Sequence, residues 1–486
     1  MQTLRASKCG LSTSKLSPAI LEIIDSLSKA GYDAYIVGGG VRDLMLGENP
    51  KDFDAVTNAT PAQIKQVFGR RCRIIGRRFE LAHVHSGREL IEVATFRAPP
   101  KKAVTSASGM ILRDNNWGSI EQDFSRRDFS INAMYYQPRQ GIVLDFCEAF
   151  QDIQQKKLRL LGDPKQRFEE DPVRMLRTLR FAAKLGFQID QGILDIFTPE
   201  CTQLLREVSP HRLYDESQKM FSMGKLTQLL PLLIQFHIWQ QLLADLKPKI
   251  TPLMQRAAEN TDKRIAQGKS INSAFFYAVL LWQPYLERME FYRSKGVIDA
   301  EARAQASIDV LKRQATRTII PRFAETFIRE VWEMQTRLIA PKAQHIMQLV
   351  NHARFRAGFD FLLLREQSGD AATQNMGAWW EQFQELNNDQ KEKAIADYRR
   401  QQQRSRKKTT EQSAEPFVPL VLETEVNSRA ARRAKQKALV KQQRAEIIDK
   451  VPVSMQQGQG ISPDHPILKR RRVQRDLSHV VFGPTQ

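Results

Sequence analysis

The stretch from Tyr35 to Asp54 limits what this chain can fold into more than any other. It reads YIVGGGVRDLMLGENPKDFD. Residues of high strand propensity precede three glycines, an apolar helical pattern covers residues 41–46, and an Asp-Phe-Asp triplet follows Pro50. We therefore expect a buried strand, a glycine turn over residues 38–40, a short helix and a second strand that begins with the triplet.

The glycine turn has the features of an anion-binding site. Backbone amides at the start of a helix lack intrahelical partners, and glycines let a ligand approach those amides closely. Gly38 and Gly39 are therefore candidate triphosphate-binding residues. Arg42, in the first turn of the expected helix, supplies a charged donor for the same anion.

The triplet predicts two carboxylates on one face of a strand. Residues i and i+2 of a strand face the same side, so Asp52 and Asp54 point to one place while Phe53 turns into the core. Two close carboxylates repel unless a cation lies between them, and oxygen ligands beside a phosphate site suit Mg²⁺. We interpret Asp52 and Asp54 as catalytic metal ligands.

Each feature alone also has an ordinary explanation. A glycine run after a strand is often a plain turn, and Asp-X-Asp is often a solvated loop. Their succession within one short stretch is far more specific, and it indicates metal-dependent phosphoryl or nucleotidyl transfer.

Two further motifs lie downstream. Residues 125–134 read SRRDFSINAM, in which Asp128 also suits a plain helix N-cap. Farther on, Asp171 and Pro172 form a cap and a first-turn proline, and arginines recur every third residue at positions 174, 177 and 180. A salt-bridged solvated face explains such a band. With few acids opposite them, however, three arginines would repel one another unless an anion lies nearby.

The motifs VGGGVRD, KDFD, RRDFSINA and EDPVR together resemble those of class II template-independent RNA nucleotidyltransferases. That family contains bacterial poly(A) polymerases and CCA-adding tRNA nucleotidyltransferases. The resemblance implies that Arg127 contacts the nucleotide and that Asp128 contacts the ribose or the active-site metal. As third catalytic carboxylate we favour Asp128 over Glu92, which lies on an alternating strand pattern over residues 90–96.

The resemblance also assigns the arginine-rich segment. It implies that Glu170, Asp171 and Arg174 replace a nucleic-acid template by reading the edge of one base, which carboxylate acceptors and guanidinium donors can do. Arg177 and Arg180 match family positions that hold the triphosphate. This motif is shared by members that add ATP and members that add CTP, so it does not choose between them.

Two features favour the poly(A) polymerase branch. GRRFELAHV at residues 76–84 resembles that branch, and its Arg77 and Arg78 are candidate RNA contacts, although a solvated turn also explains them. Residues 399–486 hold 19 Lys/Arg and 8 Asp/Glu, a net +11 out of +20 for the chain. Such a tail binds RNA phosphates without sequence preference, or is merely solubilising. Its candidate RNA-binding residues are Lys407, Lys408, Arg432, Arg433, Arg470 and Arg471.

Composition sets the remaining bounds. A sequence pI of 9.8 favours a polyanionic partner. The four cysteines are widely spaced, which argues against a zinc site and fits a reducing compartment. No apolar run is long enough for a transmembrane helix, so we expect no membrane span.

We therefore expect an α+β protein with a nucleotidyltransferase head on a small mixed β-sheet, an all-α neck and body, and a basic tail. The predicted divisions are a flexible N-terminus (1–17), the head (18–150), a helical neck (151–208), a helical RNA-binding body with aromatic residues in its core (209–397) and a largely disordered tail (398–486).

The expected activity is the addition of AMP from ATP to RNA 3′ ends with Mg²⁺ and release of pyrophosphate. We expect a cytoplasmic location and a partner among the RNA-decay machinery or RNA chaperones. One rival is a CCA-adding enzyme on the same fold that uses CTP and ATP. Another is a non-catalytic RNA-binding protein, which the intact Asp52/Asp54 pair opposes.

Overall fold

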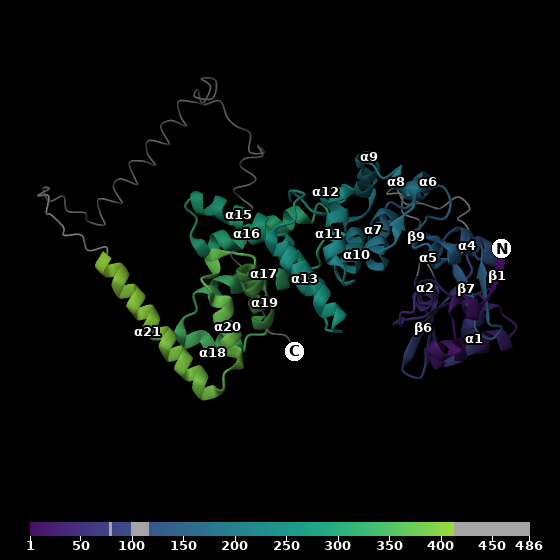
Figure 1. Cartoon of the computed structure of the whole chain (residues 1–486), viewed down its shortest axis with the longest axis horizontal. Helices are drawn as coiled ribbons and strands as arrows, with labels where there is room; N and C mark the ends of the chain where they lie inside the picture. The colour runs from purple at the N-terminus through teal and green to yellow at the C-terminus, as the bar shows by residue number, and fades with distance from the viewer. Residues whose placement is uncertain (77–79, 99–115, 413–486) are drawn as a thin grey trace, which may run out of the picture. The chain divides into compact units, whose positions relative to one another are not determined.

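The structure is a computed structural model that describes residues 1–76, 80–98 and 116–412, with side chains up to residue 404. Residues Met1–Gln402 form one compact unit, which contains the head, the neck and the body (Figure 1).

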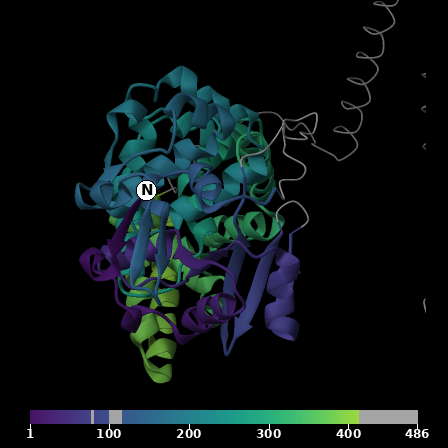
Figure 2. The ribbon, with the colours of Figure 1, turned by 90° about the vertical axis from the view of Figure 1, so that its right-hand side faces the viewer.

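A mixed sheet forms the head, and Figure 2 shows its strands side by side. Over the described residues the strand order is β1-β8-β7-β2-β3-β6-β5-β4. Every neighbouring pair is antiparallel except β3 and β6, which run parallel. The strands are β1 (Gln2–Arg5), β2 (Ala34–Val37), β3 (Asp54–Thr57), β4 (Cys72–Ile75), β5 (Leu81–Ser86), β6 (Glu89–Thr95), β7 (Met134–Gln137) and β8 (Ile142–Asp145).

Local sequence signals account for the helices of the head, which are α1 (Pro18–Lys29), α2 (Gly39–Met45), α3 (Pro61–Phe68) and α4 (Ile120–Ser125). Helix α1 starts with the Ser17 side chain accepting from the Ile20 amide at 3.3 Å, and its apolar stripe is fully buried. Helix α3 has a capping box between Thr60 and Gln63. The predicted strand before the glycine turn is confirmed as β2, and the alternating strand pattern over residues 90–96 is confirmed by β6.

The prediction of a flexible N-terminus over residues 1–17 is wrong. Strand β1 pairs antiparallel with β8 at the edge of the sheet, and two 3₁₀ turns follow it. Leu4, Cys9 and Leu11 are buried in the head core. The few apolar residues of this segment are enough to attach it to the sheet.

The neck and body are helical. Helix α7 (Val173–Leu185) contacts α10 (Pro210–Phe221) and α11 (Leu226–Gln235), and Trp239, Trp332 and Trp380 are fully buried, as expected for core aromatics. The other elements are α5 (Ala149–Gln154), β9 (Lys157–Leu158), α6 (Pro164–Glu170), β10 (Gln188–Ile189), α8 (Gln191–Leu194), α9 (Pro199–Thr202), α12 (Trp239–Leu242), α13 (Pro252–Ala266), α14 (Ser273–Leu280), α15 (Trp282–Ser294), α16 (Asp299–Gln314), α17 (Arg322–Ile339), α18 (Ile346–Val350), α19 (Phe355–Gln367), α20 (Met376–Glu385) and α21 (Asn388–Gln412).

The start of the tail differs from the prediction. Helix α21 continues to Gln412, so residues 398–412 are helical rather than disordered. Lys407 and Lys408 lie on this helix, beyond the described side chains, and the other candidate RNA-binding residues of the tail lie outside the described residues.

In the part of the chain that the structure describes, no helix is both long enough and apolar enough to cross a membrane. All four cysteines are free thiols.

Candidate active site

The glycine turn connects β2 to α2. Gly38 has a φ of +81°, a conformation that favours glycine, and α2 begins at Gly39 rather than at Val41 as predicted. A Cβ on Gly40 would lie 2.9 Å from Cδ1 of Phe53 and 3.2 Å from the carbonyl oxygen of Asp52. The third glycine therefore lets the start of α2 pack directly against the Asp-Phe-Asp segment.

This packing brings Asp54 beside the turn. A Cβ on Gly38 would lie 3.8 Å from Oδ2 of Asp54, which is the first residue of β3. Phe53 is buried as predicted. Asp52 precedes the strand instead of forming part of it, so the predicted two-residue alternation within one strand is wrong, although Asp52 still acts electrostatically on Asp54.

A third carboxylate joins this pair from β6. The parallel pairing of β3 and β6 places Glu92 directly opposite Asp54. Asp54 is open to solvent, yet desolvation by the surrounding protein raises its pKa to about 6; the negative charges of Glu92 and Asp52 act in the same direction, and Arg127 opposes them. Three carboxylates thus meet one nearby arginine, Arg127, and the His83 ring, which lies 3.4 Å from Glu92.

This carboxylate cluster fits a divalent cation. Within the described ranges, no group of three or more His, Cys, Asp or Glu side chains is arranged to hold a metal on protein ligands alone. Mg²⁺ does not need such a group, because it commonly binds to one or two carboxylates and takes its other oxygens from water and substrate phosphates. Asp52 and Asp54, beside a glycine turn suited to phosphate, match that donor set.

Asp123 holds the side chain of Arg127 in place. The guanidinium of Arg127 donates to Oδ2 of Asp123 at 2.8 and 3.1 Å and to the hydroxyl of Tyr135 at 3.0 Å. Asp123 is fully buried; burial would raise its pKa, but Arg127 and Arg126 outweigh that effect and hold the pKa below its usual range. Arg127 is thus fixed close enough to Asp54 to act on its charge.

Asp128 points to a different partner. One carboxylate oxygen accepts from the Phe129 amide at 2.8 Å and from the Asn132 side chain at 3.4 Å. The other lies 2.5 Å from the Arg177 guanidinium on α7. The structure thus joins Asp128 to the neck arginines, and it places Glu92, not Asp128, next to Asp54.

Arg42 is buried beneath the glycine turn. Its side chain donates to Asp43 at 2.5 and 2.8 Å and to the Asn132 side chain at 2.6 Å, and it lies over the Phe181 ring at 5.2 Å. Its Nη2 would lie 3.4 Å from a Cβ on Gly39. Arg42 therefore supports the turn from within, and its contact with a triphosphate stays a prediction.

The base-reading motif of the neck straddles the break between α6 and α7. Glu170, the last residue of α6, pairs with Arg167 at 2.8 Å and with Arg174 at 3.0 Å. Asp171 accepts from the Val173 amide at 3.3 Å and pairs with Arg212 of α10 at 2.7 Å. The prediction that Asp171 caps a helix with Pro172 at its first position is wrong: α7 starts at Val173, Pro172 is its N-cap residue, and Asp171 follows the end of α6.

Carboxylates offset the expected repulsion among the neck arginines. Arg174 pairs with Glu170, Arg177 with Asp128, and Arg180 with Glu216 of α10 at 2.9 Å. Asp128 and Glu216 come from distant elements, so the spacing along α7 gave no sign of them, whereas Glu170 precedes Arg174 by four residues.

Phe181 lies among three arginines. Its ring centroid is 4.5 Å from the guanidinium carbon of Arg180, 5.2 Å from that of Arg42 and 6.0 Å from that of Arg177. The ring also meets Phe129 edge to face at 5.4 Å. One aromatic side chain therefore connects the helix after the glycine turn, the Asp128 segment and the neck arginines.

Sequence reasoning missed several residues of this site, namely Asp123, Tyr135, Arg167, Phe181 and Glu216. Asp123 was detectable in principle, since it precedes Arg127 by four residues, a spacing at which acids and arginines commonly pair, although Arg127 lies beyond the end of α4. The other contacts depend on packing between elements. Arg77 and Arg78 lie outside the described residues.

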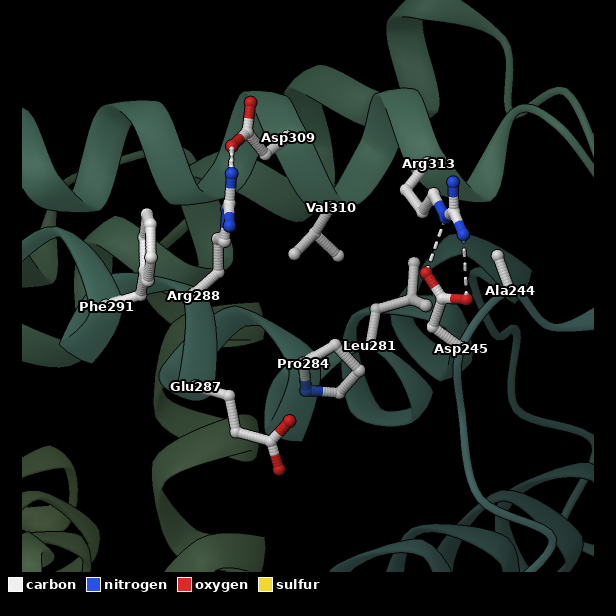
Figure 3. A pocket seen from close by; sticks show the side chains of 10 residues that line it. All are labelled: Ala244, Asp245, Leu281, Pro284, Glu287, Arg288, Phe291, Asp309, Val310 and Arg313. Carbon is white, nitrogen blue, oxygen red and sulfur yellow. Dashed lines mark hydrogen bonds and ion pairs between the residues drawn. The ribbon is translucent and has the colours of Figure 1, made fainter.

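Two recesses are found in the helical body. One, of about 520 Å³, lies between α15 and α16, with Pro284 and Val310 among its lining residues (Figure 3). The other, of about 340 Å³, lies against α13, α14 and α19. Neither is lined by residues of the glycine turn or of the neck motif.

Comparison with protein families gives three matches: "Poly A polymerase head domain" at residues 34–159, "Probable RNA and SrmB- binding site of polymerase A" at 186–250 and "Polymerase A arginine-rich C-terminus" at 295–414. Poly(A) polymerase I of Haemophilus influenzae is 39% identical over 420 residues, which are 83% of this chain and 93% of that protein. The CC-adding tRNA nucleotidyltransferase of Halalkalibacterium halodurans is 37% identical over 196 residues, only 40% of this chain and 46% of that protein.

Among solved structures, a CCA-adding enzyme in an apo form matches with a TM-score of 0.55 and 21% identity, covering 80% of this chain and 89% of its own. At that identity the likeness concerns the fold alone. The likeness to the poly(A) polymerase thus extends over more than twice as much of the chain as the likeness to the CC-adding enzyme.

Proposed function

The chain belongs to the family of bacterial poly(A) polymerases, and from that premise we propose that it adds AMP from ATP to RNA 3′ ends at the glycine turn. This proposal is supported by three residues that lie close together: Gly38 follows β2, Asp54 begins β3, and Glu92 lies in the middle of β6. In the reaction the 3′-hydroxyl oxygen bonds to the α-phosphorus, the bond to the bridging oxygen breaks, and pyrophosphate and the hydroxyl proton are released.

Asp52 and Asp54 are the proposed ligands of Mg²⁺. When bound, the metal supplies Lewis-acid stabilisation of the charge that develops on the reacting and leaving oxygens. We propose Glu92 as the third carboxylate of this cluster in place of Asp128, because β6 aligns Glu92 with Asp54. Asp128 then orients Arg177, with which it forms an ion pair.

The triphosphate is proposed to lie along the start of α2 and the neck. The turn provides backbone amides, and Arg127, braced by Asp123, provides a fixed positive charge close to the carboxylates. Arg177 and Arg180 contribute further charge from α7. Both arginines already have carboxylate partners, which hold the guanidinium groups in position. When a triphosphate binds, these arginines exchange one anionic partner for another.

Adenine selection is assigned to Glu170, Asp171 and Arg174. Two ion pairs hold Glu170, and Arg212 holds Asp171, so acceptors and donors are presented at the helix break in a fixed arrangement. Hydrogen-bonding groups held in this way favour a base with the complementary edge, because a base with another edge leaves those hydrogen bonds unmade. RNA binding by the body and tail, a partner from RNA decay or an RNA chaperone, and a cytoplasmic location stay predictions.

The test is Mg²⁺-dependent extension of two RNAs, a generic oligomer ending in A and a tRNA lacking its CCA end, with each nucleotide offered singly and in mixture. We expect long tails on the generic oligomer from ATP alone. Growth confined to the tRNA, ending after two C and one A, would instead establish the CCA-adding rival. If RNA binds but neither substrate grows, the non-catalytic rival holds.

A metal-ligand variant gives the matching control. Asp54→Ala is expected to abolish extension while RNA binding, measured by titration of a fluorescent oligomer, survives. Near-normal turnover of this variant in Mg²⁺ would refute the assignment of Asp54 as a metal ligand.

A further inference from the structure

The smaller recess of the helical body combines positive charge with an aromatic wall. It measures about 340 Å³ and lies between α13, α14 and α19, and we call it the α13–α19 pocket. Its charged lining residues are Arg264 of α13, Arg354 and Arg356 at the start of α19, and Asp360 of α19. Three guanidinium groups therefore face one carboxylate.

The ion pairs leave part of this charge uncompensated. Arg354 is matched by Glu330 of α17 at 2.6 Å. Arg264 and Arg356 share Asp360, at 3.9 Å and 3.0 Å, and the Arg356 side chain is 67% exposed. Burial raises the pKa of Asp360, while Arg356 and Arg264 oppose that shift. One carboxylate thus serves two guanidinium groups, and the pocket retains capacity to bind an anion.

The opposite side of the pocket provides a surface for a planar group. Phe275 of α14 is partly buried and meets Phe361 edge to face at 5.9 Å. Asn272 accepts from the Ala274 amide at 2.9 Å through its side-chain oxygen, which leaves its NH₂ group for a ligand. Among the described residues the Asn260 side chain has no hydrogen-bond partner. An anion site beside an aromatic ring and free amides matches a nucleotide, whose phosphate, base face and base edge require these three groups.

The larger recess provides an internal comparison. Its lining contains Asp245, Glu287 and Asp309 against only Arg288 and Arg313, so its charged residues sum to −1. Figure 3 shows both arginines already bonded within the recess, Arg288 to Asp309 and Arg313 to Asp245. A phosphate would meet net negative charge in the larger recess. The larger volume of that recess therefore does not make it the better RNA-binding site.

The α13–α19 pocket lies within reach of an RNA whose 3′ end is in the head. Helix α13 packs on α11, and α11 packs on the neck helix α7. The axes of packed helices are about 8–10 Å apart, so two such steps put the axis of α13 at most about 20 Å from that of α7. Stacked nucleotides advance about 3.4 Å each along one strand, so about six nucleotides span that distance.

We propose that the α13–α19 pocket binds one nucleotide of single-stranded RNA upstream of the 3′ end, with Arg264 and Arg356 on its phosphate and Phe275 against its base. The pocket acts as an anchor for the primer and has no part in the chemistry. This inference rests on the proposed function, because it takes the RNA primer as the ligand.

The test compares primers of 4 and 15 nucleotides, on either side of the estimated span. The variant is Arg264→Gln combined with Arg356→Gln, and the matched control is Arg288→Gln combined with Arg313→Gln in the larger recess. For the pocket variant we expect the KM for the long primer to rise about tenfold, the scale of two lost phosphate contacts, with the short primer and kcat unchanged. The slope of log affinity against log salt for the long primer falls by about one to two.

An unchanged KM for the long primer, or an equal rise for both primers, overturns the proposal, as does the same effect from the control. Loss of acidic-peptide binding in the pocket variant, with no change in RNA binding, would overturn the proposal and assign the pocket to a protein partner instead. Should the double variant fail to fold, the single Arg356→Gln, at an exposed side chain, and Phe275→Leu provide the same comparison. Binding titrations with both primers are read without ATP, so a failure of AMP addition in the wild type leaves the pocket result intact.

Discussion

Replacement of Phe181 by leucine tests whether a single ring positions the neck arginines for ATP. Leucine keeps an apolar side chain in a buried site but removes the aromatic face. The ring lies 4.5 Å from the guanidinium of Arg180 and 6.0 Å from that of Arg177, whose side chains are 15% and 35% exposed. We expect Arg180 to lose most, because its contact is the shorter and the better desolvated.

The magnitude follows from these contacts. A partly desolvated cation–π contact contributes about 1–2 kcal/mol. Glu216 continues to hold Arg180, so about 1.4 kcal/mol is a reasonable loss in nucleotide binding, which corresponds to about a tenfold rise in the KM for ATP. The third contact, to the buried Arg42, affects stability instead, since Arg42 belongs to the support of the glycine turn.

The assay is steady-state extension of a saturating RNA primer with varied ATP. Phe187→Leu is the matched control: both phenylalanines are 5% exposed, and over the described residues no cationic group lies over the ring of Phe187. Both leucine variants lose similar stability, but only Phe181→Leu raises the KM for ATP, and Phe181→Tyr restores it. An unchanged KM in Phe181→Leu, or an equal rise in Phe187→Leu, would refute the positioning role.

Three further predictions concern the head and the tail. In thermal melts in EDTA at pH 8, we expect Asp54→Asn to raise the thermal midpoint of unfolding, because a carboxylate whose folded-state pKa is raised to about 6 destabilises the folded protein above that pH. The difference in midpoint between the variant and the wild type shrinks as the pH falls through 6, and it vanishes below about 4. Glu92→Gln increases the Mg²⁺ concentration needed for half-maximal extension, whereas Asp128→Asn raises the KM for ATP; the opposite pattern in Mg²⁺ and ATP titrations would restore Asp128 as the third carboxylate. Removal of residues 413–486, which hold 13 Lys/Arg and 7 Asp/Glu, weakens RNA binding and flattens its salt dependence, and an unchanged salt slope would count against an RNA-binding tail.

Much of the fold was predictable because its signals are local. The caps of α1 and α3, the buried stripe of α1 and the strand patterns of β2 and β4–β6 depend on residues within a few positions of one another. The same holds for the glycine turn and the acidic triplet, whose chemistry is encoded in consecutive residues. Family motifs then linked these segments to nucleotidyl transfer before any contact was known.

Local sequence signals gave wrong predictions where a segment pairs with residues that are distant in the chain. The first residues lack a strong pattern, and β1 exists because β8, about 140 positions later, offers it a free edge. The neck arginines looked uncompensated because their spacing describes one helix, while Asp128 and Glu216 approach that helix from other elements.

The sequence alone thus determined the chemistry of this protein: a glycine turn, paired carboxylates and an arginine-rich neck, each readable because its groups are neighbours in the chain. Only the tertiary structure decided which of these groups meet. It aligned Glu92 with Asp54 through a parallel strand pair, committed Asp128 to Arg177, and placed Phe181 among arginines of the head and the neck. Such contacts join residues far apart in the chain, and their geometry depends on how whole elements pack, which no short window of sequence encodes.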